Sequence, residues 1–260
     1  MAGALDELNA RISELRSDLT FMALATQLRP RIGDVVQWQA AGEVLELVNQ
    51  FMRAKSNHPE GIYGPLLVRL LAGFERYLRL LIIQSVEHHT SEATIYDDLS
   101  ETLRKRNLIL TGRIFASIEE PRDHLALDIE SLISNLASCK LGSNKFRLNA
   151  QAFSAAVTGT SPSVIEKALR YVDVSDWWDG VGRNAALARL LQTKGPRATG
   201  IRASERLKEL CRWRNDIAHG GDEEIALTES QLREAIDFVD SFSAALDTIV
   251  NESLRRVAQS

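Results

Sequence analysis

Hydrophobic residues recur at helical spacing along most of this chain. Between residues 66 and 82 they follow steps of three and four, the pattern of a helix with one broad face in a core. Proline is favoured at the first position of a helix, so this helix is expected to begin at Gly64-Pro65. The apolar stripe consists of Leu66, Leu67, Leu70, Leu71, Phe74, Tyr77, Leu78, Leu81 and Ile82. We expect this helix to be central to the core.

A second stripe lies near the amino terminus. It has heptad-like spacing and consists of Leu5, Leu8, Ile12, Leu15, Leu19 and Met22. Such a helix can pair with a partner helix, or it can pack on its own domain, as short stripes more often do. Pro30 interrupts the pattern, and a further helix is expected over about 34–55. Residues 1–60 are therefore predicted to be an N-terminal helical segment, a candidate for oligomerisation or partner binding.

The remaining segments also favour helices. Ser91-Glu92 is expected to cap a helix reaching about residue 118, and Ser161-Pro162 to open one ending near residue 172. Between residues 141 and 160 the apolar period is lost and turn residues cluster, which predicts a short irregular or strand-like insertion. The predicted fold class is all-α, a helical bundle with this insertion and the N-terminal segment.

Two long helices are expected at the carboxyl end of the chain. The first begins near Gly200 and carries Leu207, Leu210 and Trp213 on its apolar side. The second starts at Thr228-Glu229-Ser230-Gln231, which matches a capping box, in which the first and fourth residues bond each other's backbone. The stripe that follows consists of Leu232, Ile236, Val239, Phe242, Leu246, Ile249 and Leu254.

Charge restricts how this chain could bind nucleic acid. The 260 residues carry a net charge of -4, so any such contact must use a local basic patch. From Arg197 to Arg214 six basic residues face two acidic ones, a local net of +4. The alternative interpretation is a solvated helix face with intrahelical ion pairs. Within this segment Arg202, Arg206 and Arg212 are the candidate RNA-binding residues.

Metal and membrane chemistry find little support in the sequence. Cys139 and Cys211 are far apart, and no histidine has His-Glu-x-x-His spacing, so we expect no disulfide, metal site or cofactor. No stretch approaches the roughly 20 apolar residues of a membrane span. A cytoplasmic location is the default expectation.

The most unusual chemistry lies at residues 214–219, which read Arg-Asn-Asp-Ile-Ala-His before Gly220-Gly221. Asn215 and His219 are four residues apart and share a helix face, so the amide can orient the ring. The glycines are expected to end the helix and leave His219 at its carboxyl end, where an imidazolium is favoured. Its pKa would then lie near or above about 6.5. A fixed cation beside a titratable ring suits phosphodiester chemistry.

This motif resembles the Arg-x4-6-His signature of the HEPN superfamily, helical domains that include many metal-independent endoribonucleases. A helix with Phe74-Glu75 and a Trp-containing segment before the motif resemble the RiboL-PSP-type HEPN group. The resemblance implies a HEPN-like domain over residues 61–260, RNA as substrate, a homodimer with a composite groove, and a toxin or defence effector with an antitoxin or defence-complex partner. It assigns catalysis to Arg214 and His219, oriented by Asn215 and Asp216.

Other interpretations of the same residues stay open. The motif could be a buried Arg-Asp bridge beside a capped histidine, in a non-catalytic HEPN-like binding module or an accessory subunit of a defence or toxin-antitoxin complex. Glu75 could approach Arg214, or pair with Arg79 four residues on. Trp177-Trp178 could anchor the core, as paired tryptophans more often do, or stack on bases.

Overall fold

A computed structural model describes residues 3–32, 60–116, 128–140, 145–219 and 227–257. Within these ranges the chain is all-α, as the sequence predicts, without a strand. The elements are α1 (Ala4–Ile32), α3 (Glu60–Glu92), the 3-10 turn η1 (Tyr96–Asp98), α4 (Glu101–Ala116), α5 (Ile129–Lys140), α6 (Ala150–Ser154), α7 (Pro162–Tyr171), α8 (Trp177–Gly182), α9 (Ala185–Leu190), α10 (Pro196–His219) and α11 (Glu229–Val257).

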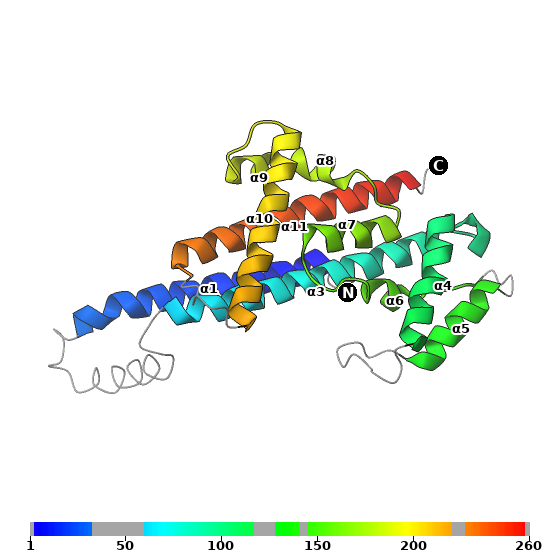
Figure 1. The fold of residues 1–260 in the computed structure, drawn as a ribbon, viewed down its shortest axis with the longest axis horizontal. Helices are drawn as coiled ribbons and strands as arrows, with labels where there is room; N and C mark the ends of the chain where they lie inside the picture. Colours follow the sequence, from blue (N-terminus) through cyan, green and yellow to red (C-terminus); the bar gives the residue numbers. More distant parts are fainter. Residues whose placement is uncertain (1–2, 33–59, 117–127, 141–144, 220–226, 258–260) are drawn as a thin grey trace.

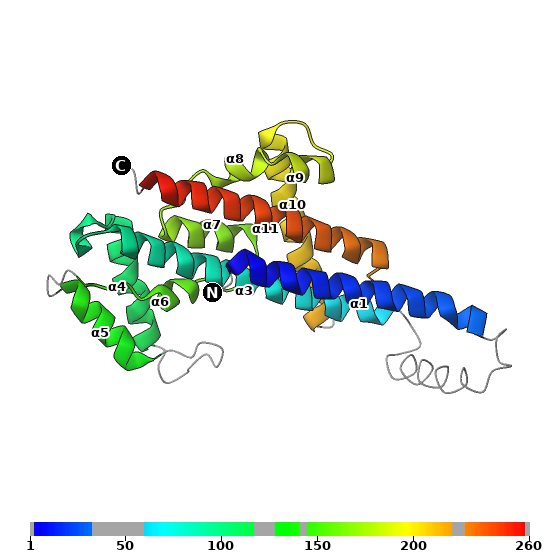
Figure 2. The same cartoon turned by 180° about the vertical axis from the view of Figure 1, so that it is seen from behind.

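Three long helices, α1, α3 and α11, lie side by side and form the main core (Figures 1 and 2). The rings of Phe74 in α3 and Phe242 in α11 meet edge to face, 5.9 Å apart. The hydroxyl of Tyr77 donates to the backbone carbonyl of Ser243 at 3.0 Å, which satisfies a polar group that burial would otherwise penalise. The predicted stripe of α3 is therefore central to the core.

Helix α1 packs on its own chain. Its predicted stripe is buried against α3 and α11, and the buried members are Leu8, Ile12, Leu15 and Leu19. Outside the stripe, Arg16 bonds Asp237 and Asp240 of α11, at 2.8 and 2.9 Å. Of the two interpretations of this stripe, packing within the chain is the one seen. The helix predicted over about 34–55 lies outside the described residues.

Several helix boundaries differ from those predicted. Helix α3 begins at Glu60 rather than at Gly64-Pro65, so Pro65 lies inside it and costs one backbone hydrogen bond near its start. Helix α1 also continues past Pro30, to Ile32. Ser91 is near the end of α3, and the cap of α4 is Ser100, whose Oγ accepts from Leu103 N at 3.1 Å.

The segment between α5 and α7 is irregular. Its described residues contain the short helix α6 and no strand, so the strand-like alternative is wrong. Asn149 is buried just before α6, and its backbone N–H donates to Asn107 of α4 at 2.9 Å. Its side-chain amide donates to Thr111 of α4 and to the Leu132 carbonyl of α5, both at 3.0 Å. One asparagine thus ties three elements together.

Two of the predicted caps are confirmed. Thr228 and Gln231 form the reciprocal capping box of α11: Thr228 N donates to Gln231 Oε1 at 2.9 Å, and Gln231 N donates to Thr228 Oγ1 at 3.2 Å. Ser161 caps α7 by accepting from Val164 N at 3.4 Å. These bonds satisfy backbone donors that a helix start leaves without partners.

Candidate functional site

The predicted motif lies on α10, which crosses the long helices on the face turned to the viewer in Figure 1. The helix begins at Pro196, four residues before the predicted start, and its Ala203, Leu207 and Leu210 are fully buried. It ends at His219, directly before Gly220, as the sequence predicts. Gly220 and Gly221 themselves lie outside the described residues.

Two glycines fix where α10 lies. A Cβ at Gly182, at the end of α8, would come within 2.1 Å of the Pro196 carbonyl oxygen, so glycine is needed where the start of α10 packs. Near the other end, a Cβ at Gly64 of α3 would meet Ile217 Cγ2 at 3.3 Å. Ile217 is partly buried against the core. The motif segment is therefore held directly on the first turns of α3.

Arg214 is half-buried, one helical turn before Ile217. It forms no ion pair within the part of the chain that the structure describes, so the Arg-Asp bridge is not seen there. Its positive charge acts on the nearby thiol of Cys211. Burial raises the pKa of that thiol, while a contact with Thr160, 3.4 Å away, and the Arg214 charge lower it. Sequence reasoning missed this thiol and hydroxyl.

The other motif residues complete this end of α10. Asn215 is exposed and Asp216 half-buried, and neither side chain has an ion-pair or hydrogen-bond partner among the described residues. His219 is the last helical residue, four positions after Asn215, which puts the two positions on one helix face. Position 219 also lies at the negative end of the helix dipole, where a cation is favoured.

The predicted basic patch is divided around the helix. Arg202 pairs with Glu205 at 3.2 Å. The guanidinium of Arg206 lies 5.0 Å from the Trp213 ring centroid, pairs with Glu209 at 2.6 Å, and is 3.6 Å from Glu234 of α11; its side chain is only 13% exposed. Arg202 and Arg206 thus form intrahelical ion pairs, which is the alternative interpretation of the patch, with partners three residues further along the helix. Their role in RNA binding stays a prediction.

Arg212 differs from these two arginines. It is exposed and forms no ion pair with any described residue. At 3.6 residues per turn, it shares a face with Lys208 and Asn215, whereas Arg206 lies on roughly the opposite side of α10. Arg212 is therefore the one of the three predicted RNA-binding arginines that is both exposed and unpaired in the described structure.

Glu75 pairs with Arg79 rather than with Arg214. The carboxylate and guanidinium are 2.6 Å apart, and both side chains are about one-fifth exposed. Glu75 is eleven residues beyond Gly64, or about 16 Å along α3 from the contact with α10. The intrahelical alternative is the one observed.

Of the paired tryptophans, Trp177 is a core residue, and Trp178 packs against the core while partly exposed. Their ring centroids are 4.0 Å apart, and Trp177 also meets Phe242 edge to face. Trp177 is buried, whereas Trp178 is half-exposed at the surface between α8 and α10. Of the two rings, only that of Trp178 is therefore accessible for stacking on a base.

The described residues form neither a metal-binding cluster nor a membrane-spanning helix. No cluster there holds three or more histidine, cysteine, aspartate or glutamate side chains that could bind a metal. No described helix is long and apolar enough to cross a membrane.

An all-α bundle that holds an Arg-x4-His motif at the end of a crossing helix defines a HEPN-type domain. The RiboL-PSP-HEPN family matches residues 41–252, and the chain belongs to this family. The resemblance that the motif and its context suggest is thus confirmed. No curated protein and no solved structure matches the chain.

Proposed function

We propose that this protein is a metal-independent endoribonuclease that cleaves RNA by attack of the 2′-hydroxyl. The observation that carries the proposal is the geometry of α10 in a member of this family. Arg214 has no ion-pair partner among the described residues, five positions before a histidine that ends the helix. The charge of an ion-paired arginine is offset by its partner, whereas no described carboxylate offsets that of Arg214, which leaves it available to a phosphate.

The reaction needs little from the protein, since RNA brings its own nucleophile. The 2′-oxygen loses its proton and bonds to phosphorus, and the P–O5′ bond breaks as the 5′-oxygen gains a proton. The products are a 2′,3′-cyclic phosphate and a 5′-hydroxyl. Arg214 neutralises the charge on the non-bridging oxygens, and His219 carries the protons. Asn215 and Asp216 orient the pair.

The decisive assay incubates the purified protein with mixed RNAs in excess EDTA. Cleavage is expected to continue and to leave cyclic phosphate ends. Arg214→Ala should lower the rate by about 10²- to 10³-fold, the loss typical of removing a charge-stabilising group. Arg255→Ala is the matched control, because Arg255 is an exposed arginine in the last turn of α11. A requirement for magnesium, or a 5′-phosphate product, would refute this mechanism.

Substitution of the histidine tests the proton transfers. His219→Ala should reduce cleavage by about 10²- to 10⁴-fold. It should change the free energy of unfolding by less than about 1 kcal/mol, because His219 is the last residue of a helix. Global unfolding of this variant, measured by circular dichroism, would favour a structural role for the motif.

We further propose that the activity serves a toxin or defence effector held in check by a partner protein. This role follows from the proposed nuclease activity, since uncontrolled cleavage of cellular RNA would stop growth. Expression of the wild-type chain should arrest cell growth, and expression of folded Arg214→Ala at the same level should not. Equal arrest by both chains would support the second candidate, a non-catalytic binding or accessory subunit, in which the motif only holds a partner.

A further inference from the structure

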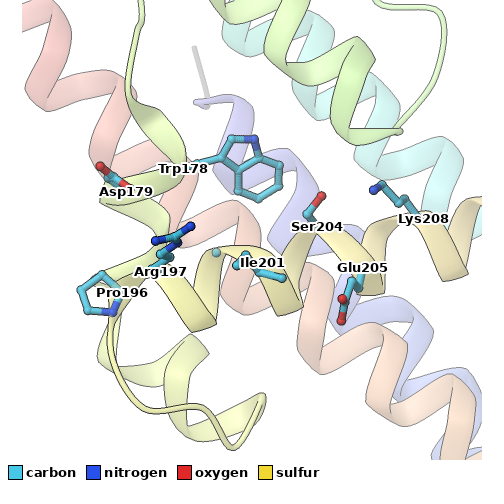
Figure 3. A pocket seen from close by; sticks show the side chains of 9 residues that line it. Trp178, Asp179, Pro196, Arg197, Ile201, Ser204, Glu205 and Lys208 are labelled. Atoms are coloured by element: carbon cyan, nitrogen blue, oxygen red, sulfur yellow. The ribbon is translucent and has the colours of Figure 1, made fainter.

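A surface pocket lies between α8 and the first half of α10, away from the motif. Its volume is about 410 Å³, within the range of small-molecule sites. Figure 3 shows the indole of Trp178 over α10, with Arg197 near one end of the pocket and Ser204 and Lys208 near the other. Ile201, which is 53% exposed, contributes an apolar surface below the indole.

The lining combines an aromatic ring with available cations. Trp178 is half-exposed, with Trp177 stacked on it. Arg197 and Lys208 are exposed and form no ion pair within the described ranges, whereas the carboxylate of Glu205 is already paired with Arg202. A ring for stacking, an apolar surface and two unpaired cations are the groups that proteins use for single-stranded nucleic acid. Asp179 is the one carboxylate of the lining without a described partner.

The face of α10 that lines the pocket leads to Asn215 of the motif, whereas Arg214 lies about 100° around the helix from Asn215. Ile201, Ser204 and Lys208 follow steps of three and four, and the same steps lead to Arg212 and Asn215. These positions lie within roughly 80° of one another around the helix axis. Ser204 is ten residues before Arg214, about 15 Å along the helix. At 3.4 Å per stacked nucleotide, that separation corresponds to about four nucleotides.

We infer that this pocket binds a nucleotide of single-stranded RNA flanking the cleavage site, with the base on Trp178 and its phosphate near Lys208 and Arg197. The inference rests on the proposed nuclease function and adds a second contact on the same strand. It also explains how a protein with a net charge of -4 can hold RNA, because the exposed cations Arg197, Lys208 and Arg212 follow one face of α10. Since stacking tolerates any base, the pocket contributes affinity rather than sequence preference.

The test measures binding of a fluorescent, mixed-sequence 12-nucleotide RNA to the full chain carrying His219→Ala, so that no strand is cut. Adding Trp178→Ala should raise Kd by about 5- to 150-fold, the range for loss of one stacked base. Lys208→Glu should raise Kd at least about fivefold and lower the salt dependence by about one phosphate contact. Lys167→Glu, the same charge change on an exposed lysine of α7 outside the pocket, should leave Kd within about twofold.

Trp178 also contacts the core, so Lys208→Glu decides the outcome if Trp178→Ala unfolds. Values of Kd within twofold of the parent for every folded pocket variant would overturn the inference, and this is also the result if the pocket holds a peptide. If the pocket variants bind RNA more weakly but the wild-type chain cleaves no RNA, the pocket is supported and the nuclease is refuted. If cleavage depends on Arg214 but not on Trp178 or Lys208, the nuclease is supported and the nucleotide-binding pocket is refuted.

Discussion

The environment of a charge, rather than its presence, decides what each arginine of α10 can do. Arg206 stacks over Trp213 and holds Glu209, so removing it would expose part of the indole and leave a carboxylate without its partner. Arg202 is a surface residue whose only described partner, Glu205, is exposed too. A stacked, largely buried arginine contributes packing as well as charge, whereas an exposed pair contributes little.

We therefore expect the two substitutions to differ in stability. Arg206→Ala should lower the free energy of unfolding by about 1–3 kcal/mol, from the lost cation-π contact with Trp213 and the lost hydrogen bond to Glu209. Arg202→Ala should change it by less than about 0.5 kcal/mol. Urea denaturation followed by circular dichroism measures both values. If Arg206→Ala changes the free energy of unfolding as little as Arg202→Ala, the contacts of Arg206 contribute no net stability.

The sequence locates the motif but not the surroundings of each side chain. Counting charges from Arg197 to Arg214 groups residues that the helix distributes over different faces. Arg212 remains exposed, whereas Arg206 lies against Glu234, which is 28 positions later and belongs to another helix. The Trp178 pocket was missed because it forms only where α8 meets α10. The aromatic pair was its one sequence signal, and that pattern favours a core.

Between elements, close contacts at two glycines place the candidate sites. Gly182 lets α8 meet the start of α10, and Gly64 lets α3 meet its end. Boundaries governed by local bonds, such as the Thr228 capping box, can be predicted, since their partners lie within four residues. The position of Pro65 inside α3 could not, because packing of the long helix compensates for one lost hydrogen bond.

A pair of glycine substitutions tests the contact between α8 and α10. Gly182→Ala should destabilise the protein by about 2 kcal/mol or more, because its Cβ would meet backbone atoms that cannot rotate away. Gly112→Ala in α4 is the control: beyond the neighbouring backbone of α4, no atom of the described residues lies within 4 Å of its Cβ position, and alanine favours a helix interior by up to about 1 kcal/mol. Thermal unfolding measures both. A neutral Gly182→Ala would show that α10 can shift without cost.

The junction of α3 and α7 should respond to acid. His89 is buried in α3, and its Nε2 lies 3.1 Å from the Val172 carbonyl oxygen, so a neutral ring can donate there. Burial lowers the pKa of His89 from 6.5, despite the opposing effects of that bond and of Asp173. The unfolded chain then binds the proton more readily than the folded one. The stability from the neutral ring is complete above about pH 6.5 and falls as pH drops toward the lowered pKa.

His89→Gln isolates this contribution, because glutamine retains an N–H donor but does not titrate. The free energy of unfolding should fall less steeply between pH 7 and 5 in the variant than in the wild type. Urea denaturation at a series of pH values gives both slopes. Identical slopes would show that His89 does not titrate differently in the folded and unfolded chains.

At the scale of the whole molecule, α1 belongs to the bundle that supports α10. An apolar stripe reveals that a helix is buried, but it does not identify the surface that covers it. The structure supplies this surface, namely α3 and α11. Deleting α1 would expose the apolar faces of both helices. A change in assembly could then result from misfolding as well as from the loss of an interface. A role of residues 1–60 in assembly stays a prediction, and surface substitutions are the better test of it.

We expect the active unit to be a two-fold dimer in which two α10 motifs form one groove. A single motif offers one guanidinium and one imidazole, whereas the reaction uses a base, an acid and a charge clamp. Two copies supply all three, and a two-fold interface is the commonest homo-oligomer arrangement. Two copies would also double the unpaired cations facing the RNA, so binding should weaken with salt.

Mixing inactive chains tests this composite groove. Arg214→Ala and His219→Ala protomers, combined under conditions that allow exchange, should recover a small part of the wild-type rate. Each mixed dimer has the charge clamp on one chain and one of the two proton carriers on the other, whereas each variant alone lacks the clamp or both carriers. Each variant mixed with itself is the matched control and should stay inactive. Full activity from a wild-type species that light scattering shows to be monomeric would exclude a shared groove. Arg214 and His219 would then have to act within one chain, five positions apart on α10.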